Sequence, residues 1–181
     1  METTLNQDVL HKGPAVEGKK VIPAGLVTGE IAGLIMAVVV MLVFAVFLGK
    51  SPFYPVQVIG STLYGEAALQ GFHLGAFLTG LILHLAGPSL LWGFIYGLIA
   101  KKLFVHTTGA ALGLGLIIGI LAMVGPYILI PAVMKALQGV DYWNREVPLS
   151  WDWAAHLVYG ASFVFYPRVL KALQRERPRS A

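Results

Sequence analysis

Long apolar runs alternate with short polar segments along this chain, and the runs are too long for the core of a soluble domain. A helix needs roughly 20 residues to cross a hydrocarbon layer about 30 Å thick. Four runs reach that length: Gly25–Leu48, Gly75–Ala100, Gly109–Val133 and Trp151–Leu170. The pattern predicts an all-α integral membrane protein in which residues 25–170 form four transmembrane helices, arranged as two helical hairpins.

The polar segments predict what lies outside the membrane. The first twenty residues are polar, and residues 1–24 are predicted to form a disordered cytoplasmic tail, whereas residues 171–181 are predicted to form a basic cytoplasmic tail. The connection 49–74 is long for a simple loop and contains an apolar run of its own, Val56–Leu63. That run predicts a helix at the external interface, either amphipathic or partly re-entrant.

Composition and charge strengthen the membrane prediction. Hydrophobic residues make up 57% of the 181 residues and charged residues only 12%. The net charge of +4 does not indicate nucleic acid, because most of the 13 basic residues flank the ends of the predicted helices that face one side. The other side has only Lys50, Lys135 and Arg145. The positive-inside rule therefore predicts a multi-pass protein of the bacterial inner membrane with both termini in the cytoplasm.

The two predicted hairpins resemble each other. The second and fourth helices each carry a histidine, a glycine, a serine and a tyrosine in the same order: His84, Gly87, Ser89, Tyr96 and His156, Gly160, Ser162, Tyr166. A parallel internal repeat around an axis along the membrane normal is one explanation. Chance convergence on residues that membrane helices favour is the other, and the sequence leaves both open.

Glycines recur every fourth residue in the first and third helices. Small residues at this spacing let two helix backbones approach closely, and a narrow pore lined by glycine is the alternative. The glycines concerned are Gly25, Gly29, Gly33, Gly109, Gly113, Gly115 and Gly119. We interpret them as helix-packing faces, through which, together with the external loops, the chain would contact other membrane subunits in the lipid bilayer.

One carboxylate, Glu30, lies in the first predicted helix and has two interpretations. A charged group in the membrane is costly, so it could be a proton or cation ligand that faces the bundle. Alternatively, the helix crosses from Ile31, and Glu30 stands in its favourable first turn near Lys19 and Lys20. The shallow position favours a helix-start charge at the cytoplasmic interface.

Two histidines are the other candidate site residues. His84 lies near the middle of the second helix, and an imidazole there needs hydrogen-bond partners within the protein. Pro88 leaves the His84 carbonyl without its helical donor, and the Ser89 hydroxyl is placed to replace it. His84 and His156, on different helices, could ligate a b-type haem. The alternative is that each histidine bonds a hydroxyl on a neighbouring helix.

No motif indicates an enzyme. The chain has no cysteine, which excludes disulfides and thiolate metal sites. It also has no nucleotide-binding loop, metalloprotease helix or nucleophile elbow. The sequence predicts a non-catalytic protein with no metal site and no cofactor, haem b being the alternative.

Three stretches carry a resemblance to a known group of proteins. They are FYPVQVIGSTLYGEAAL, LILHLAGPSLLWGFIYGLIA and WDWAAHLVYGASFVFY. With them, residues 24–166 resemble small bacterial four-helix inner-membrane proteins, some of which carry a sodium:proline symporter label. The resemblance implies the four-helix topology. It does not imply symport by this chain alone, because sodium-coupled symporters build a midplane site from many more helices.

These observations leave three functions open. The first is an accessory or structural subunit of a larger bacterial membrane complex, with respiratory or other electron-transfer machinery as its expected setting. The second is a small transporter or channel that oligomerises, with Glu30 and His84 along its path. The third is a haem-binding or quinone-binding membrane protein. The sequence names no partner, substrate or oligomeric state.

Overall fold

The computed structural model of the chain describes residues 13–175, and this part is all-helical, with no strand. Within it, three helices are long and apolar enough to cross a membrane: Gly18–Phe47, Leu74–Lys102 and Thr108–Gln138. They correspond to the first three predicted spans. Residues 1–12 and 176–181 of the predicted tails lie outside the described residues.

The first hairpin pairs α2 (Gly13–Phe47) with a helix built from three segments. That helix consists of α4 (Leu74–His84), one π-helical turn called η2 (Leu85–Ser89) and α5 (Leu90–Lys102). A π-helical turn keeps the chain helical while it absorbs the hydrogen bond that a proline cannot donate. The start of α2 also lies earlier than expected, because residues 13–24 of the predicted tail are helical.

The second hairpin has the same plan. Its first arm is α6 (Thr108–Ala122), the π-helical turn η3 (Gly125–Leu129) and α7 (Ile130–Gln138). Its second arm is α9 (Leu149–Ala161), the short 3₁₀ segment η4 (Ser162–Phe165) and α10 (Tyr166–Arg175). The second arm contains the fourth predicted span, 151–170, but it is not among the three apolar candidates of the described chain.

Three short helices close one end of the bundle, and we call them the cap: α3 (Tyr54–Tyr64), η1 (Gly65–Leu69) and α8 (Tyr142–Glu146). The α3 helix lies in the loop 49–74, where the sequence predicted a helix. The Gln57 amide ties the loop together, because its Nε2 donates to the carbonyls of Ala68 and Gly71 at 3.0 and 2.8 Å. Its Oε1 accepts from the His73 backbone at 2.8 Å.

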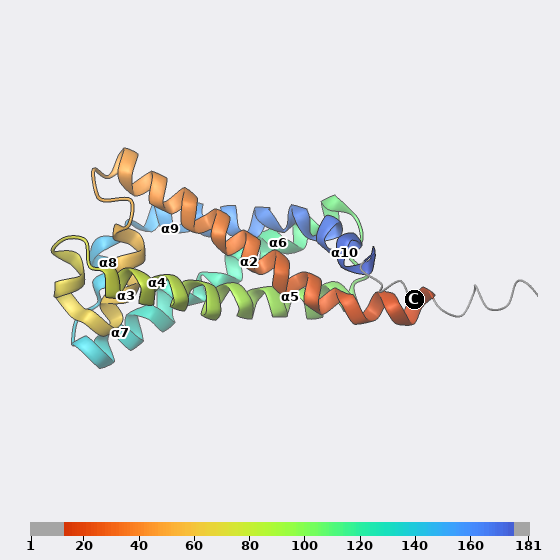
Figure 1. The fold of residues 1–181 in the computed structure, drawn as a ribbon, viewed down its shortest axis with the longest axis horizontal. Helices are drawn as coiled ribbons and strands as arrows, with labels where there is room; N and C mark the ends of the chain where they lie inside the picture. The colour runs from red at the N-terminus through yellow and green to blue at the C-terminus, as the bar shows by residue number, and fades with distance from the viewer. Residues whose placement is uncertain (1–12, 176–181) are drawn as a thin grey trace, which may run out of the picture.

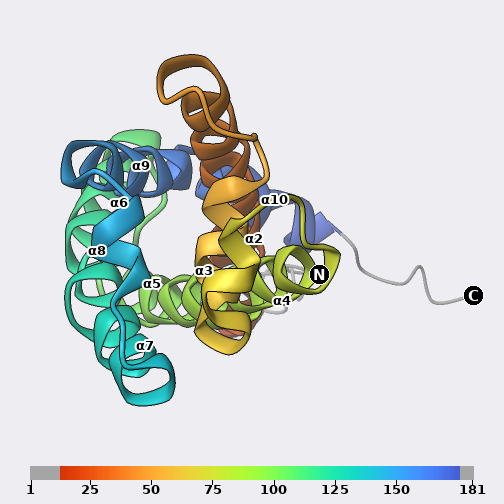
Figure 2. The ribbon, with the colours of Figure 1, turned by 90° about the vertical axis from the view of Figure 1, so that its left-hand side faces the viewer.

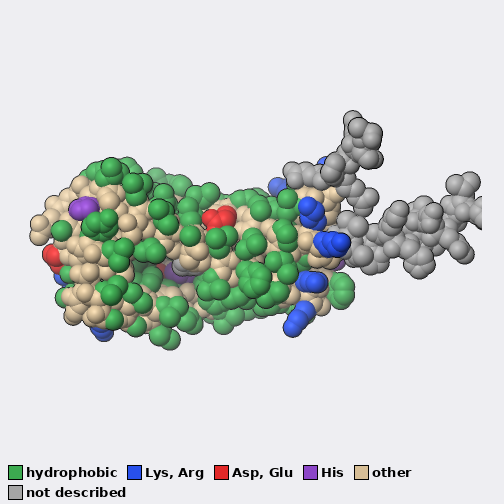
Figure 3. All heavy atoms as spheres, turned by 60° about the horizontal axis from the view of Figure 1, so that its bottom comes forward, with side chains coloured by type: hydrophobic (Ala, Val, Ile, Leu, Met, Phe, Trp, Pro, Cys, Tyr) green, Lys and Arg blue, Asp and Glu red, His purple; other side chains and the backbone are tan. Residues whose placement is uncertain are grey.

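The long helices run side by side, and α2 crosses the others obliquely (Figure 1). Figure 2 looks along the bundle from the cap and shows α6 and α7 on the side opposite α2 and α4. The described chain begins and ends at the end of the bundle remote from the cap (Figure 1). Lysine and arginine side chains gather at that end, which we call the basic end (Figure 3).

The buried apolar residues form two clusters. The cluster towards the basic end includes Tyr96, Phe163 and Tyr166, and the ring centroids of Tyr96 and Phe163 are 4.1 Å apart. The other cluster lies under the cap and includes Phe44 and Trp143. The space between these two clusters contains the candidate site.

Candidate functional site

Glu30 lies near the middle of a candidate span and not at its start. A Cβ built on the neighbouring Gly29 would be 2.5 Å from the Ser89 carbonyl oxygen. Ser89 itself stands close to the centre of the 29-residue span Leu74–Lys102. Because α2 begins at Gly13, Glu30 is far beyond the first turn. The helix-start interpretation of this carboxylate is therefore wrong.

The described residues around Glu30 leave one oxygen of its carboxylate without a hydrogen bond. Glu30 is the only Asp or Glu in the three candidate spans. Its Oε1 is fully buried and has no hydrogen-bond partner among the described residues. Its neighbours one turn away, Val27 and Leu34, are 42% and 50% exposed. Glu30 therefore stands at the edge of the bundle, next to the surface that faces outwards.

Most of the predicted glycine faces are used inside the chain. Gly25, Gly29 and Gly33 lie against η2 and α5, and Gly115 and Gly119 lie against α9 and η4. By contrast, an added Cβ at Gly109 or Gly113 would meet nothing within 4 Å. The α6 helix thus keeps one small-residue face that no described element covers.

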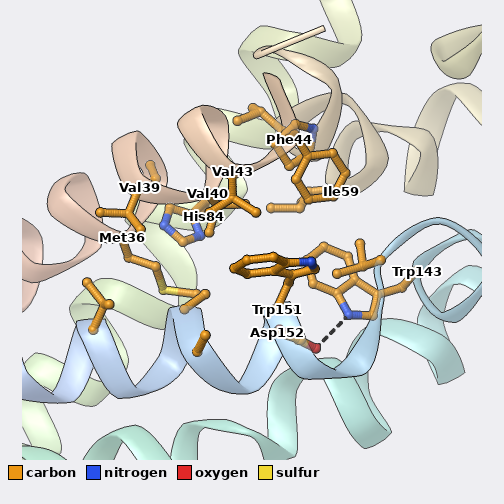
Figure 4. A pocket seen from close by; sticks show the side chains of 17 residues that line it. Met36, Val39, Val40, Val43, Phe44, Ile59, His84, Trp143, Trp151 and Asp152 are labelled. Carbon is orange, nitrogen blue, oxygen red and sulfur yellow. Dashed lines mark hydrogen bonds between the residues drawn. The ribbon is translucent and has the colours of Figure 1, made fainter. Parts of the chain in front are cut away.

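A cavity of about 220 Å³ lies between the two apolar clusters, and we call it the central cavity. All four long helices and the cap contribute to its wall. The polar or aromatic groups of that wall belong to Thr62, His84, Ser89, Trp92, Trp143, His156 and Tyr159. A second cavity of about 120 Å³ adjoins it between α2 and α9 and shares His84 and Trp143 (Figure 4). Glu30 is not part of either wall.

His84 is held in place through one ring nitrogen. Its Nε2 lies 3.2 Å from the Gly33 carbonyl oxygen of α2. The Ser89 hydroxyl donates to the His84 carbonyl at 3.2 Å, which confirms the predicted repair of the hydrogen-bond ladder at Pro88. The π-helical turn and the serine together fix the histidine beside the cavity.

His156 belongs to a buried network that includes the cap. Its Nδ1 lies 2.9 Å from the Asp152 carbonyl oxygen and 3.2 Å from Asp152 Oδ1. The other carboxylate oxygen of Asp152 accepts a hydrogen bond from Trp143 Nε1 at 3.1 Å. Figure 4 shows this bond beside the smaller cavity. Asp152 therefore joins α8 to α9 and orients the imidazole one turn further along.

The structure brings the two candidate haem ligands to the same cavity. The hydroxyls nearby are already engaged, since Tyr159 donates to the Ser89 carbonyl at 3.3 Å and Ser89 donates within its own helix. Neither histidine bonds a hydroxyl of a neighbouring helix in the described chain. In residues 13–175 no group of three or more metal-binding side chains gathers either.

Sequence reasoning missed Asp152 and Trp143 as site residues. From the sequence alone, Asp152 is interpreted as a favourable charge in the first turn of a helix, and Trp143 as an aromatic residue at the membrane interface. The available signal was the spacing of four residues between Asp152 and His156, which places both on one helix face.

Charged residues link the cap helices at its outer edge. Glu146 accepts from the Tyr54 hydroxyl at 2.6 Å and from Arg145 Nε at 2.7 Å, and Arg145 also bonds Glu66 at 2.9 Å. Burial alone would raise the pKa of the Glu146 carboxyl, but the bonds from Tyr54 and Arg145 bring it below its ordinary value of 4.5. Burial, together with the bond to Glu146, raises the pKa of Tyr54.

We expect the Glu146 contribution to stability to depend on pH. Because the folded-state pKa is lowered, the contribution is complete above the ordinary pKa of 4.5 and disappears as the pH falls through the lowered value. At pH 7, Glu146→Gln should cost about 1.5 kcal/mol, the low end for a bond to a charged group. Thermal unfolding of both chains between pH 7 and pH 3 measures the difference. Glu66→Gln is the matched control with little effect, and a pH-independent difference would contradict the assignment.

The chain was compared with protein-family models, with curated proteins and with solved structures, and none of them matches it.

Proposed function

We propose that the chain is a non-catalytic accessory subunit of a larger protein complex in the bacterial inner membrane. In this proposal it crosses the bilayer four times, with both termini in the cytoplasm. The arm α9–η4–α10 supports a fourth crossing because it runs beside α6, with Gly160 against Gly115 and Gly119. The basic residues at the end where the described chain begins and ends support the orientation.

The observation that carries the proposal is the position of Glu30. A carboxylate at mid-span costs roughly 2.5–3.5 kcal/mol on insertion scales unless another group compensates it. The described chain offers its buried Oε1 no donor. The adjoining flank is exposed and apolar at Val27 and Leu34. A helix of another subunit, with a lysine, arginine or other donor at the same depth, would cover the flank and compensate the carboxylate.

Co-purification tests this proposal. The tagged chain is purified in mild detergent from its native membrane, and the proteins that accompany it are quantified by mass spectrometry. We expect a stoichiometric membrane partner that falls at least tenfold with Glu30→Gln, because the amide removes the charge that pairs with the partner. Glu66→Gln removes a carboxylate of the cap that already pairs with Arg145 and is 52% exposed, so it should retain the partner.

A photo-crosslinking residue maps the contact. p-Benzoylphenylalanine in place of Leu34 should form an adduct with the partner's transmembrane segment, at a depth where that segment carries a basic or donor residue. The same residue in place of Ile128, which is 61% exposed in η3, is the control and should not form this adduct. A chain that purifies alone, or a partner that Glu30→Gln leaves in place, would refute the proposal.

A small transporter remains the second candidate, because of the position of the central cavity. The cavity approaches the cap, whereas Tyr96, Phe163 and Tyr166 pack between it and the basic end. A transporter needs a binding site between its helices that can be reached from one side at a time, and a cavity in this position could be such a site. Solute uptake into proteoliposomes that contain only this chain would favour this candidate over a subunit role.

A further inference from the structure

We propose that the central cavity binds a small apolar ring that carries a hydroxyl donor, a ligand of the phenol or hydroquinone class. The inference goes beyond the subunit role and does not need a partner chain. It rests on three features of the cavity: its size, its apolar wall and the hydrogen-bonding state of the two histidines.

The tautomer of each histidine follows from its partner. A carbonyl oxygen only accepts, so the contact between His84 Nε2 and the Gly33 carbonyl places the proton on Nε2. The same reasoning places the proton of His156 on Nδ1, because both of its contacts are oxygens of Asp152. In the neutral imidazoles, His84 Nδ1 and His156 Nε2 are therefore hydrogen-bond acceptors.

These two acceptors are unused polar groups of residues that line the cavity. No described group bonds either nitrogen, and neither is among the fully buried atoms without a partner, which are Glu30 Oε1 and Tyr166 Oη. Both nitrogens thus keep accessible surface. Four of the other polar side chains of the wall already donate, Thr62 to Ile59, Ser89 to His84, Tyr159 to Ser89 and Trp143 to Asp152, whereas the indole N–H of Trp92 has no acceptor among the described residues. A ligand that fits must therefore donate to the histidines, and its hydroxyl oxygen can also accept from Trp92.

The remaining wall selects the rest of the ligand. The wall is almost entirely apolar and includes Met36, Trp92, Leu129 and Val133. A dry cavity of roughly 150 Å³ binds benzene. The central cavity, at about 220 Å³, has room for a substituted ring. An ammonium ion would donate equally well but would lose its hydration in apolar surroundings, so a neutral hydroxyl is favoured.

Matched probes test the donor requirement. The full chain in phosphatidylcholine nanodiscs is titrated with 4-propylphenol and with 4-propylanisole, whose methyl ether keeps the ring and removes the donor. We expect the phenol to bind at least tenfold more tightly than the ether. His84→Leu and His156→Leu should each reduce this ratio at least fivefold. His106→Leu, a change outside the cavity, should leave the ratio unchanged.

Two further measurements keep the inference testable if a histidine variant fails to fold. Ala122→Leu fills the cavity without removing a polar group, because Ala122 is a buried wall residue. It should abolish binding of both probes, whereas Gly113→Leu on the same helix should not. In ¹⁵N-histidine NMR spectra, we expect a proton on Nε2 of His84 and on Nδ1 of His156.

Three outcomes would overturn the inference. Equal affinity for phenol and ether would remove the donor requirement. The absence of binding by either probe would leave a cavity that holds only water. Haem absorption in the purified protein that disappears with His84→Leu would assign the two nitrogens to iron.

Discussion

Leucine in place of Gly119 should separate the two arms of the second hairpin. A Cβ at this position would lie 3.1 Å from Gly160 Cα and would overlap the His156 carbonyl oxygen. Both neighbours are backbone atoms, which cannot move aside as a side-chain end can. Overpacking costs about 1–3 kcal/mol when side chains adjust, so we expect a loss of about 3 kcal/mol or more here.

Gly113→Leu provides the control on the same helix, because a Cβ there meets nothing within 4 Å. Each variant replaces one glycine of α6 by leucine, so both add the same apolar volume and both remove a residue with low helix propensity. Denaturant unfolding in detergent micelles, followed by tryptophan fluorescence, compares them with the natural chain. We expect Gly113→Leu to remain within about 0.5 kcal/mol of it, as substitutions away from packed features usually do. Equal stability of the two variants would refute the close approach of α6 and α9.

Asp152→Leu should detach the cap from α9. Asp152 is 6% exposed and Trp143 is 8% exposed, so the indole N–H that loses its acceptor cannot reach water. An orphaned buried donor costs about 1–3 kcal/mol, to which the lost orientation of His156 adds. We expect a loss of about 3 kcal/mol together with greater mobility of Trp143.

Asp152→Asn distinguishes the loss of the acceptor from the loss of charge. The asparagine Oδ1 can still accept from Trp143, so this variant should lose about 1 kcal/mol, the usual worth of a neutral bond. Near-ultraviolet circular dichroism reports the tryptophan environment in both variants. The network would be refuted if Asp152→Leu kept the native tryptophan signal and the native stability.

The helices could be predicted because their causes are local. Three apolar runs long enough to cross a bilayer appear as helices, and the helix α3 forms where the loop 49–74 has its own apolar run. Pro88 and Ser89 indicated the weak point in α4–η2–α5 for the same reason, since a proline affects the carbonyl four residues before it. The start of α2 was missed because residues 13–24, with Glu17, Lys19, Lys20 and two prolines, continue the helix of the apolar run towards the N-terminus.

The site could be predicted only in part because its chemistry depends on contacts between distant segments. His84 and His156 attract attention as ionisable groups in apolar runs. Which nitrogen each leaves unused depends on Gly33 and on Asp152, and no sequence pattern joins Gly33 to His84. The interpretation of Glu30 as a helix-start charge was wrong because α2 begins at Gly13 and packs Gly29 against Ser89, near the middle of the neighbouring candidate span. Hydropathy alone cannot supply that register.

The length of α2 has a consequence for the membrane around the protein. Its candidate span of 30 residues would reach about 45 Å, well beyond the roughly 30 Å of a hydrocarbon core. Hydrophobic mismatch of this kind is relieved by tilting, and α2 already crosses its neighbours obliquely (Figure 1). A thinner bilayer would favour a larger tilt of α2 away from the bilayer normal. The glycine contacts between α2 and α5 oppose this tilt. Bilayer thickness thereby acts on the same helix that carries Glu30.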